Sequence, residues 1–145
     1  MANLNKKMVL VLVFFLMIIS SSFARYEKDK DGEFWYDEDG KIIHMRLADG
    51  GEAWLVNGKA VHGIAPNGNE YWANEEGNII HNKNANGRES WFDDQGRILH
   101  LIDEYGAECW YDKDGNPTYS IEANGDEMWY DKKGNIIHTK PVNKY

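Results

Sequence analysis

Short apolar segments alternate with polar, glycine-containing turns along the chain, and glycine interrupts each segment before it reaches the length of a helix. In the first such stretch, Trp35-Tyr36 and Ile42-Ile43 are aromatic and β-branched residues typical of strands. Between them, Asp37 suits the first position of a type I turn, and Gly40 suits the left-handed residue that closes it. This pattern predicts a β-hairpin with a three-residue loop.

The same pattern occurs six times in all, with a period of about 19 residues, which identifies tandem repeats. The units run approximately over 32–50, 51–68, 69–87, 88–106, 107–125 and 126–145. Each contains one tryptophan: Trp35, Trp54, Trp72, Trp91, Trp110 and Trp129. Two residues before each tryptophan stands a glutamate: Glu33, Glu52, Glu70, Glu89, Glu108 and Glu127. One further slot holds His44, His62, His81, His100, Tyr119 and His138.

The second unit is one residue shorter than the others and tests the hairpin interpretation. Its turn contains Asn57-Gly58, the pair that a two-residue type I′ turn prefers, so the deletion falls in the loop. Counting residue pairs back from each loop, we expect Trp35 to face Ile43 and Trp54 to face Val61. The strand register therefore survives the deletion.

Successive units are linked by a second turn, marked in the first unit by Asp49-Gly50. If these links are two-residue turns, Met45 opposes Trp54, and by the same count Asn82 opposes Trp91 and Leu101 opposes Trp110. Because side chains alternate along a strand, this register puts every Trp on one face and every His on the other. We therefore predict an all-β fold: an antiparallel meander of about twelve short strands, coiled into a roll or superhelical solenoid.

Both predicted faces are partly apolar, and curling would bury one of them more deeply. We expect the six tryptophans to form the structural core, because their face is filled in nearly every unit. The opposite face then supplies the candidate ligand-binding residues: Tyr36, His44, His62, His81, Phe92, His100, Tyr111, Tyr119, Tyr130 and His138.

Two stretches carry a resemblance to known repeat families. The segment Trp91-Phe92-Asp93-Asp94-Gln95-Gly96-Arg97-Ile98-Leu99 resembles the Tyr-Asp repeats of bacterial surface and toxin-shell proteins, of the YD/RHS type. The segment Trp54-Leu55-Val56-Asn57-Gly58-Lys59-Ala60-Val61 is similar to cell-wall-binding and choline-binding repeats, and the style is also that of MORN repeats. The resemblance covers residues 33–140 and implies hairpins wound into a spiral sheet. Choline-binding repeats close their cage with a Gly-Trp pair where this chain has His.

The first 24 residues have the pattern of a signal peptide. Lys6 and Lys7 precede an apolar run of eleven residues from Val9 to Ile19, and Ser22 and Ala24 provide a small-residue cleavage site. The run is shorter than the roughly 20 residues that span a bilayer. An uncleaved membrane anchor is the alternative. We expect residues 25–145 to form a single exported domain, secreted or in the periplasm or cell envelope, with no membrane span after cleavage.

Composition narrows the functional classes. The chain has 16 Lys and Arg against 24 Asp and Glu, a net charge of −8, which argues against nucleic acid or anionic lipid as partner. Its one cysteine, Cys109, excludes an intramolecular disulfide, a CxxC redox pair and a cysteine zinc cluster. We expect Cys109 to be a small half-buried side chain on the face of Tyr111, with a reactive thiol as the alternative.

The histidine column is the first candidate for chemistry. Equivalent residues of successive units are two strands apart, roughly 9.5–10 Å, which is too far for one metal ion to bind both. We therefore predict no metal site and regard the histidines as structural or surface residues, with a binding-face role or a metal site in a one-strand-per-turn coil as alternatives. The acidic stretch from Glu27 to Gly32, with Glu38, mimics a calcium loop, but no helices flank it and turn chemistry explains its aspartates.

No catalytic residue or cofactor is predicted, because a pattern spread evenly over six units offers no unique constellation of groups. We predict a non-enzymatic binding module for surface glycan or protein. The alternative is a structural spacer or toxin-associated repeat protein without a small ligand. A binding module should carry a contiguous exposed aromatic patch, whereas a spacer should carry scattered aromatic residues interrupted by charge.

Overall fold

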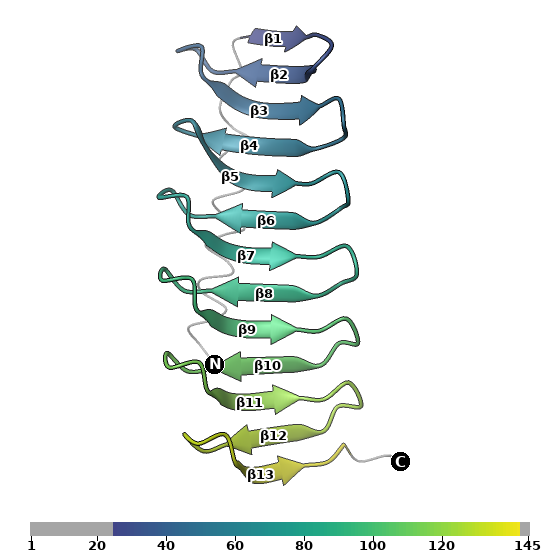
Figure 1. The fold of residues 1–145 in the computed structure, drawn as a ribbon, viewed down its shortest axis with the longest axis vertical. Helices are drawn as coiled ribbons and strands as arrows, with labels where there is room; N and C mark the ends of the chain where they lie inside the picture. Colours follow the sequence, from purple (N-terminus) through teal and green to yellow (C-terminus); the bar gives the residue numbers. More distant parts are fainter. Residues whose placement is uncertain (1–24, 143–145) are drawn as a thin grey trace.

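The computed structural model describes residues 25–142, which form one antiparallel sheet in a single layer (Figure 1). The thirteen strands of this described region lie in sequence order, and each strand contacts only its sequence neighbours. The predicted all-β meander of hairpin repeats is confirmed, and the sheet is not closed into a barrel. The predicted signal peptide, residues 1–24, lies outside the described residues. No helix in the described part is long and apolar enough to cross a membrane.

The strands alternate between those that carry a tryptophan and those that carry the histidine slot. One strand, β1, precedes the first unit, which makes thirteen rather than about twelve. The strands are β1 (Arg25–Lys28), β2 (Gly32–Tyr36), β3 (Ile42–Leu47), β4 (Glu52–Val56), β5 (Lys59–Ile64), β6 (Glu70–Ala73), β7 (Ile79–Lys83), β8 (Glu89–Phe92), β9 (Ile98–Ile102), β10 (Glu108–Tyr111), β11 (Pro117–Ile121), β12 (Glu127–Tyr130) and β13 (Ile136–Lys140).

The hairpin loops have the predicted chemistry. In the first, the Gly40 N–H donates to the Asp37 carbonyl at 3.0 Å and the Asp37 N–H donates to the Lys41 carbonyl at 2.9 Å. Gly40 has φ = 77°, the left-handed conformation that favours glycine. In the shorter second unit, Asn57 and Gly58 have φ = 51° and 78°, as a type I′ turn requires. The predicted loops are therefore confirmed, and the deletion lies in the loop.

A β-bulge follows each hairpin loop and changes the predicted register. Tyr36 pairs with Ile42 as expected, but the next pair is Trp35 with His44, so Ile43 is the extra residue. The prediction that Trp35 faces Ile43 is wrong. The same shift pairs Trp54 with His62, so the prediction that Trp54 faces Val61 is also wrong.

The links between units are also three-residue loops rather than two-residue turns. In the first link, the Leu47 N–H donates to the Gly51 carbonyl at 2.7 Å, and counting back from this pair places His44 opposite Trp54. The predicted pairings across the links are wrong: Met45 pairs with Ala53, Asn82 with Ser90 and Leu101 with Cys109.

The tryptophans and the histidine slot therefore share one face of the sheet, and the prediction of opposite faces is wrong. Because side chains alternate with a period of two, each one-residue difference in pairing moves a strand's side chains to the other face. The bulge shifts the pairing by one residue between each tryptophan strand and the strand that follows it. The three-residue link shifts the pairing by one residue between a tryptophan strand and the strand that precedes it. Within residues 25–142 the sheet is a single layer with no second layer packed on either face, and no large side chain of this region is fully buried.

Candidate functional site

A continuous column of aromatic rings crosses the whole sheet on the shared face, hereafter the ladder face. Neighbouring ring centroids are 4.3–5.2 Å apart. From Trp35 to Trp110 the planes of neighbouring rings differ by only 13–24°. The rings therefore cover each other's faces. In order, the ladder consists of Tyr26, Trp35, His44, Trp54, His62, Trp72, His81, Trp91, His100, Trp110, Tyr119, Trp129 and His138.

From β4 to β12, the glutamate two residues before each tryptophan partners the histidine slot of the preceding strand. The distance from His Nε2 to the Glu carboxylate is 2.7 Å for His44 and Glu52, and 3.0 Å for His100 and Glu108. His81 with Glu89 and His62 with Glu70 follow the same arrangement at 3.1 and 3.5 Å. Where tyrosine replaces histidine, the Tyr119 hydroxyl donates to Glu127 at 2.7 Å. These contacts explain why glutamate recurs two residues before tryptophan.

Burial decides the charge state of the central histidines. Desolvation between two indole rings lowers the pKa of His62, His81 and His100, although the neighbouring glutamates act to raise it. For these three residues desolvation outweighs the attraction of the glutamates for the protonated form. At Tyr119, burial and the hydrogen bond to Glu127 raise the pKa to about 12. Both effects favour neutral rings at His62, His81, His100 and Tyr119.

Within the described residues 25–142, no group of three or more His, Cys, Asp or Glu side chains could hold a metal ion. Each histidine ring is separated from the next by an indole ring. The acidic stretch that resembled a calcium loop forms part of β1 and a turn, in which the Asp29 carboxylate accepts from the backbone N–H groups of Asp31 and Gly32.

The ten candidate ligand-binding residues do not lie together. The ladder face holds His44, His62, His81, His100, Tyr119 and His138. The opposite face, hereafter the tyrosine face, holds Tyr36, Phe92, Tyr111 and Tyr130, since each follows a ladder tryptophan by one residue. Cys109 is half-buried on this face, as predicted, and desolvation raises the pKa of its thiol.

An apolar row crosses the tyrosine face next to the hairpin loops. From β8 to β13 its members alternate between aromatic and aliphatic side chains without a charged residue. This section, hereafter the aromatic row, consists of Phe92, Ile98, Tyr111, Pro117, Tyr130 and Ile136. The Tyr130 hydroxyl lies 2.9 Å from Ser120 Oγ, which is nearly buried at 5% exposure. Side chains of the aromatic row thus also cover small residues in the centre of the strands.

One packing feature of this face was missed from the sequence. The ring of Tyr71 lies over Gly63 on the neighbouring strand, so closely that a Cβ at Gly63 would come within 2.3 Å of it. The available signal was that the one glycine at this slot, Gly63, occurs together with the one tyrosine at the slot opposite, Tyr71.

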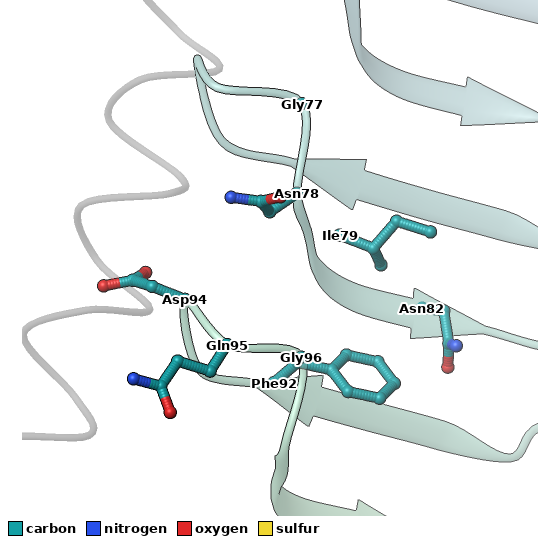
Figure 2. Close-up of a pocket in the computed structure, with 8 residues that line it drawn as sticks. All are labelled: Gly77, Asn78, Ile79, Asn82, Phe92, Asp94, Gln95 and Gly96. Atoms are coloured by element: carbon teal, nitrogen blue, oxygen red, sulfur yellow. The ribbon is translucent and has the colours of Figure 1, made fainter.

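A depression opens on the tyrosine face between the β6–β7 and β8–β9 loops (Figure 2). It has a volume of about 470 Å³ and is open to solvent. Figure 2 shows the ring of Phe92 directed along the sheet toward Asn82, with the polar loop residues at the other end. Its side-chain lining consists of Asn78, Ile79, Asn82, Phe92, Asp94 and Gln95.

Comparison with known proteins assigns the chain to no family. No protein-family model matches it, and no curated protein matches it. Among solved structures, the TCP10 domain of Danio rerio CPAP matches with 15% identity and a TM-score of 0.39, over 77% of this chain and 68% of that one. S. aureus TarM matches with 11% identity and a TM-score of 0.29, over 83% of this chain and 23% of that one. At these TM-scores neither match places the chain in a fold family or a functional class.

Proposed function

We propose that the protein is a non-enzymatic binding module and that its ligand, a glycan chain, lies along the aromatic row of the tyrosine face. The observation that carries this proposal is an aromatic–aliphatic pair repeated in three successive hairpins, where Phe92, Tyr111 and Tyr130 face an uncharged aliphatic residue. This is the pattern that distinguishes a binding surface from a spacer.

The ladder face is less suited to a stacking ligand. A sugar ring stacks on an exposed aromatic face, but the ladder rings are 4.3–4.8 Å apart from Trp35 to Trp110 and cover one another. The stacked ring pairs found among the described residues all belong to the ladder face. The candidate binding residues are thereby reduced to Tyr36, Phe92, Tyr111 and Tyr130, and the histidines are assigned to support of the sheet.

Glycan chemistry matches the composition of the tyrosine face. Sugar rings present C–H groups to aromatic rings and hydroxyl groups to amide and carboxylate side chains, and this face combines apolar strand residues with Asn, Gln and Asp in the loops. The net charge of −8 favours a neutral ligand over an acidic one. The predicted export and the resemblance to cell-wall-binding and Tyr-Asp repeats support a role at a cell surface.

A pulldown on insoluble polysaccharides tests this proposal. The full-length protein should be retained by at least one of cellulose, chitin and isolated cell-wall sacculi. The double variant Tyr111→Leu/Tyr130→Leu should lose retention, and it should fold because Leu55 occupies the same slot in the second unit. Arg46→Ala on the ladder face serves as the matched surface control. Equal retention of all three proteins, or retention of none, would refute the proposal.

The second candidate is a structural spacer, which a different observation favours. Thirteen strands in a single layer, spaced by about 4.8 Å, form a straight element roughly 58 Å long that the ring ladder stiffens along its length. A spacer of this kind needs no ligand, so failure of every polysaccharide to bind would favour it.

A further inference from the structure

The depression beside Phe92 exists because successive hairpin loops are not joined to each other. Strands β7 and β8 are connected by the link over residues 84–88, which lies at the ends of the strands away from the hairpin loops. The strand ends next to the hairpin loops are therefore free to separate. One loop earlier, a lysine closes the corresponding gap: Lys59 Nζ donates to the Glu76 carbonyl at 3.2 Å.

The repeat explains why the next gap stays open. Asn78 and Gln95 occupy the slots that Lys59 and Glu76 occupy one unit earlier. The asparagine side chain is too short to cross to the next loop as Lys59 does, and both residues instead line the depression. Gly77 and Gly96 add no side chain to it. Asparagine also stands at this slot in Asn116 and Asn135, whereas Lys41, Lys59 and Arg97 are basic. At Asn78 the short side chain leaves the gap to the next loop open.

The rim of this depression is held in place by loop hydrogen bonds. The Asn74 side chain accepts from the Asn78 N–H at 2.9 Å. On the other loop, Asp93 accepts from the Gln95 N–H at 2.9 Å and forms an ion pair with Arg97 at 2.6 Å. The backbone of both loops is thus pre-organised, which lowers the cost of ordering the site around a ligand.

The lining selects a ligand that is apolar on one side and hydrogen-bonding at its edge. Phe92 and Ile79, the latter 46% exposed, form the apolar part, while Asn78, Gln95 and Asp94 supply amide and carboxylate groups. A single carboxylate is too few for a divalent cation, and the absence of a cationic side chain from this lining disfavours an anion. A purely aliphatic ligand would leave the polar groups unpaired.

We propose that this depression is a subsite for one neutral pyranose ring, which stacks on Phe92 and forms hydrogen bonds to the side chains of Asn78 and Gln95. The ligand class rests on the proposed glycan-binding function, and the subsite specifies where one ring of the chain is held. Tyr111 and Tyr130 would contact the sugar residues that follow along the aromatic row.

Two substitutions test the subsite, and each introduces the residue that an earlier unit carries at the same position. Asn78→Lys places at this slot the residue that closes the gap at Lys59, and Phe92→Leu replaces the ring by the residue found at Leu55. Asn116→Lys and Tyr111→Leu make the same changes in the fifth unit, outside the depression. The probes are cellotetraose, N-acetylchitotetraose and maltotetraose, and the readouts are the side-chain amide signals of Asn and Gln in NMR titrations and the Kd.

We expect one probe to shift the amide signals of Asn78 and Gln95 saturably. Asn78→Lys and Phe92→Leu should each raise the Kd at least tenfold, Asn116→Lys should leave it unchanged, and Tyr111→Leu should raise it by a smaller factor. Tryptophan fluorescence should not change, because the indoles lie on the ladder face. If Tyr111→Leu abolishes binding while Asn78→Lys and Phe92→Leu bind normally, the subsite is refuted and the glycan-binding function stands. If no probe binds the parent or any variant, both proposals fail. If a probe binds and changes the tryptophan fluorescence, the ligand contacts the ladder face and the subsite is refuted.

Discussion

Trp54 lies directly opposite His62 across β4 and β5, with ring centroids 4.5 Å apart, although the loop that joins these strands is one residue shorter than in the other hairpins. The type I′ turn at Asn57-Gly58 shortens the loop, and the bulge that follows it is retained. The same stacked pair forms at Trp91 and His100, where the loop has its full length. The bulge, rather than the loop, therefore aligns tryptophan with histidine in every unit.

Acidification should destabilise the protein before its carboxylates titrate. The pKa of His62, His81 and His100 is lower in the folded state than the usual 6.5, so below pH 6.5 the unfolded chain binds protons that the folded chain does not. Stability is therefore fully present above pH 6.5 and falls as the pH drops toward the folded-state pKa values. Urea unfolding at pH 8, 7, 6 and 5 measures this loss.

The matched control for the acid effect is His81→Tyr, since Tyr119 fills the same slot in the fifth unit. Tyrosine stays neutral throughout this range, so the variant should lose less stability between pH 7 and pH 5 than the parent. Carboxylates such as Glu52, whose pKa is, despite desolvation, lowered from its usual 4.5 by His44 and Arg46, should add the same loss in both proteins at more acidic pH. An unchanged pH profile in the variant would show that the histidines are not the source of the effect.

Trp91→Ala should destabilise the sheet more than Tyr111→Ala. Trp91 is stacked between His81 at 4.5 Å and His100 at 4.6 Å, and its loss interrupts the ladder, at a cost of about 3 kcal/mol. Tyr111 has no ring stack of this kind among the described residues. Chemical denaturation midpoints give the ranking, and a larger loss for Tyr111→Ala would mean that the tyrosine face holds the sheet together.

Gly63→Ala should cost about 1–3 kcal/mol, because the added methyl group would meet the ring of Tyr71 at 2.3 Å. The double variant Gly63→Ala/Tyr71→Ala removes the obstructing ring. It should therefore lose less stability than the sum of the two single variants, as a double-mutant cycle in urea would measure. Strict additivity would show that the two residues do not contact each other in solution.

Zinc and nickel should bind weakly, without the stabilisation of about 2.7 kcal/mol expected at a hundred times the dissociation constant of a native-state site. Each histidine is separated from the next by an indole ring, so adjacent imidazoles cannot share one ion. Thermal melts with and without metal, on the parent and on His81→Gln/His100→Gln, provide the measurement. A saturable shift that disappears in the variant would contradict the ladder geometry.

The sequence alone was sufficient for the features that depend on local chemistry. The period of the tryptophans, the left-handed glycines such as Gly40 and the Asn57-Gly58 turn act within a few residues, so they predict the hairpins, their order and the position of the deletion. The candidate residues Phe92, Tyr111 and Tyr130 were also recognisable, because an aromatic residue after tryptophan recurs in the pattern.

Tertiary structure decided which side chains share a face. The bulge at Ile43 and the third residue in the Leu47–Gly51 link each move the register by one, and each would turn a strand over. Both occur because stacking of Trp35, His44 and Trp54 and the contact of His44 with Glu52 join three strands at once. The depression beside Phe92 likewise depends on whether a side chain reaches from one loop to the next, as Lys59 does. Such contacts between strands and loops cannot be counted from residue spacing within one hairpin.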